Sequence, residues 1–154
     1  MKSIYRFIVK PKGERYDNTV KIGDKELITN TRIETFQSVS KKAIVVVVPE
    51  AYKTDIKPGD EVIIHHNVFR RFYDMKGREK NSASFFKDDL FFCDIEQIYL
   101  YNKNDEWFSN LNYCFLYPVL ATDDFSTFKE QELIGILKYG NSSLEAKGIN
   151  PGAL

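Results

Sequence analysis

Few residues of this chain could bind a metal ion or act in catalysis, and their spacing fits neither role. Its only histidines are His65 and His66, which are adjacent at the end of an apolar run. Successive residues of a strand point to opposite faces of a sheet, so we expect that the two rings cannot bind one metal ion without distortion. We interpret them as strand-end histidines with hydrogen-bonded rings, and we predict no metal site.

The two cysteines offer no alternative centre. Cys93 and Cys114 fit neither a zinc-ligand spacing nor a disulfide framework. Both stand among aromatic residues, so we predict two buried, reduced thiols. Together with two adjacent histidines, they make no Ser-His-Asp or Cys-His arrangement for nucleophilic catalysis.

Paired carboxylates are the last group to consider. Asp88 with Asp89, and Asp123 with Asp124, lie beside polar turns, and we interpret them as solvated turn residues. The sequence contains no G-x-G-x-x-G turn of the kind that binds a dinucleotide. We therefore predict that the protein is not an enzyme and needs no cofactor.

Charge and hydropathy limit the classes of partner that we expect. The 154 residues include 22 basic and 22 acidic side chains, so the chain has no net charge with which to attract nucleic acid or an anionic membrane. The N-terminal apolar run is too short for a signal peptide, and no stretch approaches the roughly 18 apolar residues of a membrane span. We expect a cytoplasmic protein without nucleic-acid or membrane partners.

The elements that position these residues look like strands. Twelve Phe and nine Tyr, with β-branched neighbours, favour an all-β fold. Residues 4–11 alternate in polarity. Residues 43–51 hold a continuous β-branched run, stopped by Pro49, that predicts a strand buried on both faces or inside a barrel, and a Pro-Gly turn precedes "EVII". About five short strands separated by turns predict a small β-barrel over residues 1–101, with a linker at 102–110.

One segment of this unit has no strand pattern. From Lys12 to Lys42 the chain is polar, with charges of both signs and small apolar islands. Such a length is too great for an ordinary connection, so we expect a loop that is either functional or disordered.

The C-terminal third repeats the order of the first unit. "LNYCFLYPV" (111–119) echoes "IYRFIVKPK" (4–12), "ELIGILKYG" (132–140) echoes the strand at 43–48, and "GINPGAL" echoes "DIKPGDEV". We interpret 111–154 as an incomplete internal duplication; coincidental strand-turn-strand texture is the alternative. By repeat length alone, we expect the natural polypeptide to continue by about 40 to 50 residues.

The ordered set "YRFIVKP", "KELITN", "AIVVVV", "IKPGDEVII" and "KDDLFFCDIEQIYLY" resembles the GroES co-chaperonin family, especially the divergent co-chaperonins of large tailed bacteriophages. The resemblance covers residues 4–101, with 111–154 as a second copy. It implies a GroES-like small β-barrel with a long mobile loop and an extended roof hairpin, followed by a partial second barrel.

The resemblance also implies a function and partners. Subunits of this family form a homo-oligomeric ring, typically a heptamer, that caps a chaperonin and assists ATP-dependent folding. The expected partners are a host or phage GroEL-like chaperonin, other copies of the chain, and an unfolded client, which we expect to be a large viral protein. The nucleotide chemistry would belong to the chaperonin.

The same resemblance assigns a binding segment. The loop's apolar position is "ELIT", so Leu27, Ile28 and Thr29 would dock in a hydrophobic groove of the chaperonin. Two alternatives stay open: Val20 and Ile22 could be the anchor, or Leu27 and Ile28 could pack on their own barrel. The second copy has no matching aliphatic-Thr element, so we expect only the first copy to bind.

Residues 70–84 depart from the family pattern by extending the roof hairpin. The hairpin has five cations, Arg70, Arg71, Lys76, Arg78 and Lys80, against two acids, Asp74 and Glu79, which gives a local excess of three positive charges. It could face an acidic client, or it could simply be solvated.

Two other functions of the protein remain as alternatives: a ring-forming or virion-associated phage structural protein without capping activity, and a nucleic-acid-binding barrel that stacks bases on Phe69, Phe72 and Tyr73.

Overall fold

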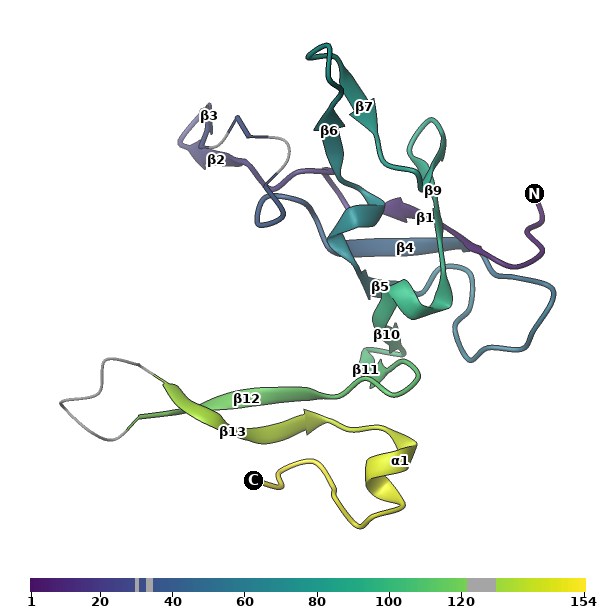
Figure 1. Ribbon diagram of the computed structural model, residues 1–154, viewed down its shortest axis with the longest axis vertical. Helices are drawn as coiled ribbons and strands as arrows, with labels where there is room; N and C mark the ends of the chain where they lie inside the picture. Colours follow the sequence, from purple (N-terminus) through teal and green to yellow (C-terminus); the bar gives the residue numbers. More distant parts are fainter. Residues whose placement is uncertain (30, 33–34, 122–129) are drawn as a thin grey trace.

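The fold is mainly β, as the composition predicts. The computed structural model in Figure 1 describes residues 1–29, 31–32, 35–121 and 130–154. Its sheets are antiparallel, and its described part holds one short α-helix, α1 (Ser142–Glu145). No helix within those ranges is long and apolar enough to cross a membrane. Asp123 and Asp124 lie outside the described residues.

Seven strands form the main sheet, in the order β11-β10-β5-β4-β1-β9-β8. Their bounds are β1 (Phe7–Pro11), β4 (Lys42–Val47), β5 (Glu61–Ile64), β8 (Phe85–Lys87), β9 (Leu90–Cys93), β10 (Ile98–Lys103) and β11 (Glu106–Ser109). Every neighbouring pair is antiparallel. Among the described residues the pairing leaves β8 and β11 at the edges and closes no barrel.

One hydrophobic core lies against β1, β4, β5 and β9. Strand β4 alternates in burial: Ala43 and Val45 are buried, whereas Ile44 is only partly so. Of the two alternatives expected for this run, burial on both faces is therefore wrong, and no closed barrel is detected among the described residues to give it an interior position. Two 3-10 turns, η1 (His66–Val68) and η2 (Ile95–Gln97), follow β5 and β9. Just after η1, the ring of Phe69 meets that of Phe91 edge to face at 4.9 Å.

The segment 102–110 differs from the predicted linker. It completes β10 and forms β11, which pair with each other through Asn102 and Trp107. The connecting residues Asn104 and Asp105 have φ values of 54° and 65°, and two consecutive positive φ values are what a type I′ hairpin turn requires. The polar "NKND" is thus a tight turn within the sheet.

Two further hairpins project from the main sheet (Figure 1). The first, β2 (Thr19–Ile22) with β3 (Lys25–Ile28), lies inside the polar loop 12–42. The second, β6 (Arg71–Tyr73) with β7 (Glu79–Asn81), is the segment expected to form a hairpin from its polar tip.

The last two strands, β12 (Phe115–Leu120) and β13 (Glu130–Tyr139), form a hairpin that extends away from the main sheet (Figure 1). Their pairing repeats that of β1 with β4, including a register shift at the same place, between Ile8 and Val9 and between Phe115 and Leu116. The matching pairs are Val9↔Val45 with Leu116↔Leu137, Lys10↔Ile44 with Tyr117↔Ile136, and Pro11↔Ala43 with Pro118↔Gly135.

The two Pro-Gly turns also bind these strands in the same way. In each turn, the glycine N–H donates to the carbonyl of a strand residue. The N–H of that strand residue donates to the carbonyl of the residue after the glycine. The bonds are Gly59 to Val45 (2.8 Å) and Val45 to Asp60 (2.9 Å), then Gly152 to Leu137 (2.8 Å) and Leu137 to Ala153 (2.8 Å). The glycines have φ values of 96° and 93°, a region that favours glycine.

Candidate functional site

The β2–β3 hairpin brings both predicted anchor segments into one element. Val20 pairs directly with Leu27, and Ile22 pairs with Lys25. Gly23, with a φ of 61°, occupies the first central position of the turn, as a two-residue II′ hairpin turn requires. Sequence reasoning treated Val20 and Ile22 as alternatives to Leu27, whereas the hairpin places them side by side.

The pairing also decides which apolar side chains share a face. Directly paired residues, and residues two apart on one strand, point to the same side of a hairpin. Val20, Ile22 and Leu27 therefore share one face, while Ile28 lies on the other. All four are exposed, between 48% for Val20 and 64% for Ile22. Leu27 and Ile28 thus do not pack on their own sheet, and a single groove would not take both from one side.

Thr29, the third predicted docking residue, closes the base of this hairpin. Its hydroxyl and its N–H both donate to the carbonyl of Asn18, at 3.0 Å and 2.8 Å. This side chain therefore fixes the hairpin.

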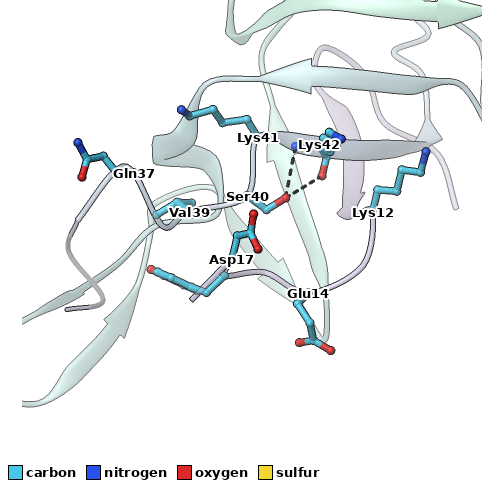
Figure 2. Close-up of a pocket in the computed structure, with 9 residues that line it drawn as sticks. Lys12, Glu14, Asp17, Gln37, Val39, Ser40, Lys41 and Lys42 are labelled. Carbon is cyan, nitrogen blue, oxygen red and sulfur yellow. Dashed lines mark hydrogen bonds between the residues drawn. The ribbon is translucent and has the colours of Figure 1, made fainter. Parts of the chain in front are cut away.

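The hairpin stands on an ordered stem. Backbone hydrogen bonds join Lys12 to Lys42 (3.0 Å), Ser40 to Arg15 (3.1 Å) and Asp17 to Ser38 (2.7 Å). An open hollow of about 390 Å³ lies beside this stem. Figure 2 shows the side chains that line it, among them Lys12, Lys41 and Lys42 with Glu14 and Asp17. Charges of both signs line it, so the hollow selects no single ligand charge.

Arg15 joins the stem to the base of the β6–β7 hairpin. Its guanidinium donates to the carbonyl of Phe69, to the carbonyl of Arg70 at 3.2 Å and to Oδ1 of Asn81 at 2.6 Å, and it lies 4.8 Å from the centre of the Phe91 ring. Burial, followed by repulsion from Arg71, lowers the pKa of Arg15 to about 10. The guanidinium is therefore still charged at neutral pH.

A second contact reinforces this junction. The Arg71 N–H donates to the Tyr16 hydroxyl at 2.6 Å, and the Arg71 guanidinium lies 5.7 Å from the centre of the Tyr16 ring. The loop stem and the roof hairpin thus form one connected unit. Sequence reasoning missed Arg15 and Tyr16, because no local pattern links residues more than 50 positions apart.

Two of the five cations of the basic roof hairpin form ion pairs with acids of the same hairpin. Arg78 bonds to Asp74 at 3.0 Å, and Arg71 pairs with Glu79 at 3.0 Å. The Arg78 N–H is the first cause of a lowered pKa of Asp74, which also accepts from Lys76 N–H. The predicted cations that form no ion pair within the described residues are Arg70, which is partly buried, and Lys76 and Lys80, which are exposed.

Phe69, Phe72 and Tyr73 do not make a common stacking surface. Phe69 is fully buried in the core, whereas Phe72 and Tyr73 are exposed. The aromatic set proposed for nucleic-acid stacking is therefore reduced to two residues.

The two histidines are oriented differently from the expectation. The strand ends at Ile64, η1 begins at His66, and the imidazole rings stack with their centres 4.3 Å apart. The opposite-face prediction is therefore wrong, because the chain leaves the strand conformation between them. Nδ1 of His65 accepts the Asn67 N–H at 3.1 Å, so it caps the turn.

His66 is partly buried, and this burial, together with the nearby His65, Arg70 and Lys41, lowers its pKa. Its ring lies 5.6 Å from that of Phe36. Across the described ranges, no three His, Cys, Asp or Glu side chains gather where they could hold a metal ion.

The cysteines differ from each other. Cys93 is buried in the core, and burial raises the pKa of its thiol well above the ordinary range. Cys114 is an exposed free thiol, so the prediction of two buried thiols is wrong for it. Asp88 and Asp89 are exposed in the turn between β8 and β9, where solvated turn residues are expected.

Comparisons with models of known protein families, with curated proteins and with solved structures found no match to this chain.

Proposed function

We propose that this chain is a co-chaperonin: a subunit of a homo-oligomeric ring that caps a GroEL-like chaperonin and assists ATP-dependent folding of a client. The observation that carries the proposal is the β2–β3 hairpin. It projects from the sheet and exposes Val20, Ile22 and Leu27 on one face. Exposed apolar side chains clustered on a protruding element are typical of a protein-interaction site.

The energetics suit reversible capping. Fully burying one such side chain contributes about 1.5–3 kcal/mol, and roughly half of that area is still exposed here, so each contributes about 1 kcal/mol on docking. Three side chains then give about 3 kcal/mol, or roughly a hundredfold in affinity per hairpin. Several hairpins on one ring would act together, because the first contact raises the effective concentration of the others.

We further propose that residues 1–101 are a GroES-like barrel unit and that 111–154 are an incomplete second unit. The order of the elements supports the first assignment: an opening strand, a long loop, a β-branched strand, and a Pro-Gly turn leading into β5. The repeated register and the repeated turn hydrogen bonds support the second. The proposed setting is the cytoplasm of a phage-infected host, with a large viral protein as the client.

Co-sedimentation with a chaperonin and ATP, combined with chaperonin ATPase assays, tests the capping function. A Val20→Ala, Leu27→Ala double variant should bind at least about tenfold more weakly than the wild type. Leu120→Ala is the control, since Leu120 is even more exposed than Val20 and Leu27 but lies on β12. Equal binding of the double variant and the wild type would reject the hairpin assignment.

A second candidate is a ring-forming structural protein without capping activity. In the part of the chain that the structure describes, β8 and β11 are edge strands, and this favours it, since unpaired strand edges can pair between neighbouring subunits. A ring that forms in solution but binds neither host nor phage chaperonin would favour this candidate.

A further inference from the structure

The short turn η1 is capped by a histidine side chain. Nδ1 of His65 accepts the Asn67 N–H at 3.1 Å, and the carbonyl of His65 accepts the Val68 N–H at 3.1 Å. The first of these bonds satisfies a backbone donor at the start of the turn, a role that Ser, Thr, Asp and Asn usually fill. Unlike the side chains of Ser, Thr and Asn, an imidazole gains a proton near neutral pH.

This capping bond requires a ring without a proton on Nδ1. An imidazole nitrogen accepts a hydrogen bond only while it carries no hydrogen, and in the doubly protonated ring both nitrogens are donors. The neutral ring of His65 therefore carries its hydrogen on Nε2. A proton added to Nδ1 would face the Asn67 N–H, donor against donor. Protonation of His65 and closure of the turn thus oppose each other.

The groups around the two imidazoles do not compensate an added positive charge. The ring of His66 stacks on that of His65 with the centres 4.3 Å apart. Burial, followed by the charge of His65, lowers the pKa of His66, and Arg70 and Lys41 lower it further. From β10, Tyr99 meets His65 edge to face at 6.1 Å, and burial raises the pKa of this phenol, so it stays neutral. Within the described ranges, no carboxylate forms an ion pair with either imidazole.

The carbonyls that follow the capped position hold two hairpins. The carbonyl of Val68 accepts the Ser82 hydroxyl at 2.6 Å, just after β7. The next two carbonyls, those of Phe69 and Arg70, accept from the guanidinium of Arg15 in the loop stem. The conformation of η1 therefore determines where three consecutive acceptors point.

We propose that His65 is a pH-sensitive cap that controls this junction. In mildly acidic solution its ring gives up the Asn67 N–H, η1 opens, and the contacts of the loop stem and the roof hairpin with the residues behind the turn weaken. The strands of the main sheet stay paired. The inference rests on the geometry of the turn and does not depend on chaperonin capping.

Amide hydrogen exchange of the full chain, measured by NMR between about pH 7.5 and about pH 5.5, covers the range in which histidines titrate. Rates are divided by those of an unstructured peptide at the same pH. We expect the protection of the Asn67 and Val68 amides to fall about fivefold on acidification, the change that the loss of a typical cap produces. The Arg71 amide, which donates to the Tyr16 hydroxyl, should lose protection over the same range.

Two controls show that the opening is local and begins at the ring. The Val45 amide, which donates to the carbonyl of Asp60 at 2.9 Å, should stay at least about tenfold better protected than Asn67 throughout. The nitrogen shifts of the His65 ring should show one hydrogen, on Nε2, at the higher pH and a hydrogen on each nitrogen at the lower pH.

Three variants assign the effect to the cap. His65→Asn is the matched variant, because an asparagine side chain can cap a turn and gains no proton in this range, so it should keep its protection at both pH values. His65→Ala has no cap, and its low protection at Asn67 should be present at both. His66→Phe keeps a ring beside His65, so the loss of protection on acidification should persist. Circular dichroism spectra check that each variant folds.

Four results would overturn the proposal. His65→Asn could lose protection on acidification as the wild type does, or His66→Phe could abolish the change and so assign it to the neighbouring ring. A hydrogen on Nδ1 of His65 at the higher pH would exclude the capping bond. Unchanged protection of Arg71 while that of Asn67 falls would show that the turn does not control the junction.

Discussion

Nη1 of Arg15 donates a hydrogen bond of 2.6 Å to Oδ1 of Asn81, across 66 residues of sequence. The same guanidinium binds the carbonyls of Phe69 and Arg70, so one side chain holds the loop stem against the roof hairpin. In the proposed co-chaperonin, this contact fixes the root of the chaperonin-binding hairpin relative to the sheet.

Replacing Arg15 should destabilise the fold. Arg15→Met keeps much of the aliphatic stem but leaves two partly buried carbonyls without their donor, and we expect a loss of about 2 kcal/mol in the free energy of unfolding. Urea unfolding followed by fluorescence measures it. Lys12→Met is the control, because the exposed Lys12–Glu61 ion pair should be worth less than about 1 kcal/mol. Equal losses for the two variants would contradict this role of Arg15.

Replacing the buried Phe69 and the exposed Phe72 should change the stability of the fold by different amounts. Phe69 is fully buried against Phe91, so Phe69→Ala should cost about 3–5 kcal/mol through the cavity it leaves. Phe72 is exposed on the roof hairpin, and Phe72→Ala should cost less than about 1 kcal/mol. Thermal unfolding of the two variants gives the comparison. A large loss for Phe72→Ala would mean that the roof hairpin packs more tightly than the structure shows.

Stability should fall as the solution is acidified. The pKa of His66 is lowered in the folded state, so the unfolded chain binds a proton at this histidine more readily than the folded chain does. The free energy of unfolding therefore rises with pH where the unfolded histidine titrates. Between about pH 7 and pH 5, the wild type should lose stability as protons bind the unfolded histidine. His66→Phe keeps a ring beside Phe36 and should reduce this slope. An unchanged slope would assign the pH dependence to other groups.

The two thiols should differ in reactivity. Cys114 is exposed and should be alkylated in the native protein. Cys93 is buried with a raised pKa, so little thiolate forms and it should react only on unfolding. Intact mass after iodoacetamide treatment should show one adduct in buffer and two in denaturant. Two adducts under native conditions would show that the core opens at Cys93.

Much of the fold follows from local sequence, and its exceptions have physical causes. The β-branched run at 43–48 predicts a strand, but a continuous apolar run cannot show that Ala43 and Val45 point inward. The polar composition at Asn104 and Asp105 predicts a linker instead of the observed turn, because a tight I′ turn and a polar linker share their composition. His65 and His66 were assigned to a strand that ends one residue earlier.

Less of the candidate site could be predicted from the sequence. The apolar islands at Val20, Ile22 and Leu27 are visible in the sequence, but only the hairpin register shows that they share a face. The partners of Arg15 lie 54 to 66 residues away, and no periodicity predicts such a contact. The likeness between the β1–β4 and β12–β13 pairings could be predicted, because the order of Pro, Gly and aliphatic residues recurs along the chain.

Hydrogen exchange on the full chain, free and bound to a chaperonin with ATP, tests the central proposal most directly. If the β2–β3 hairpin docks on the chaperonin, the amides of residues 19–28 should exchange more slowly in the complex, while those of the roof hairpin at 71–81 should be unchanged. A complex in which residues 19–28 exchange as fast as in the free protein would contradict it, as would protection confined to β12 and β13.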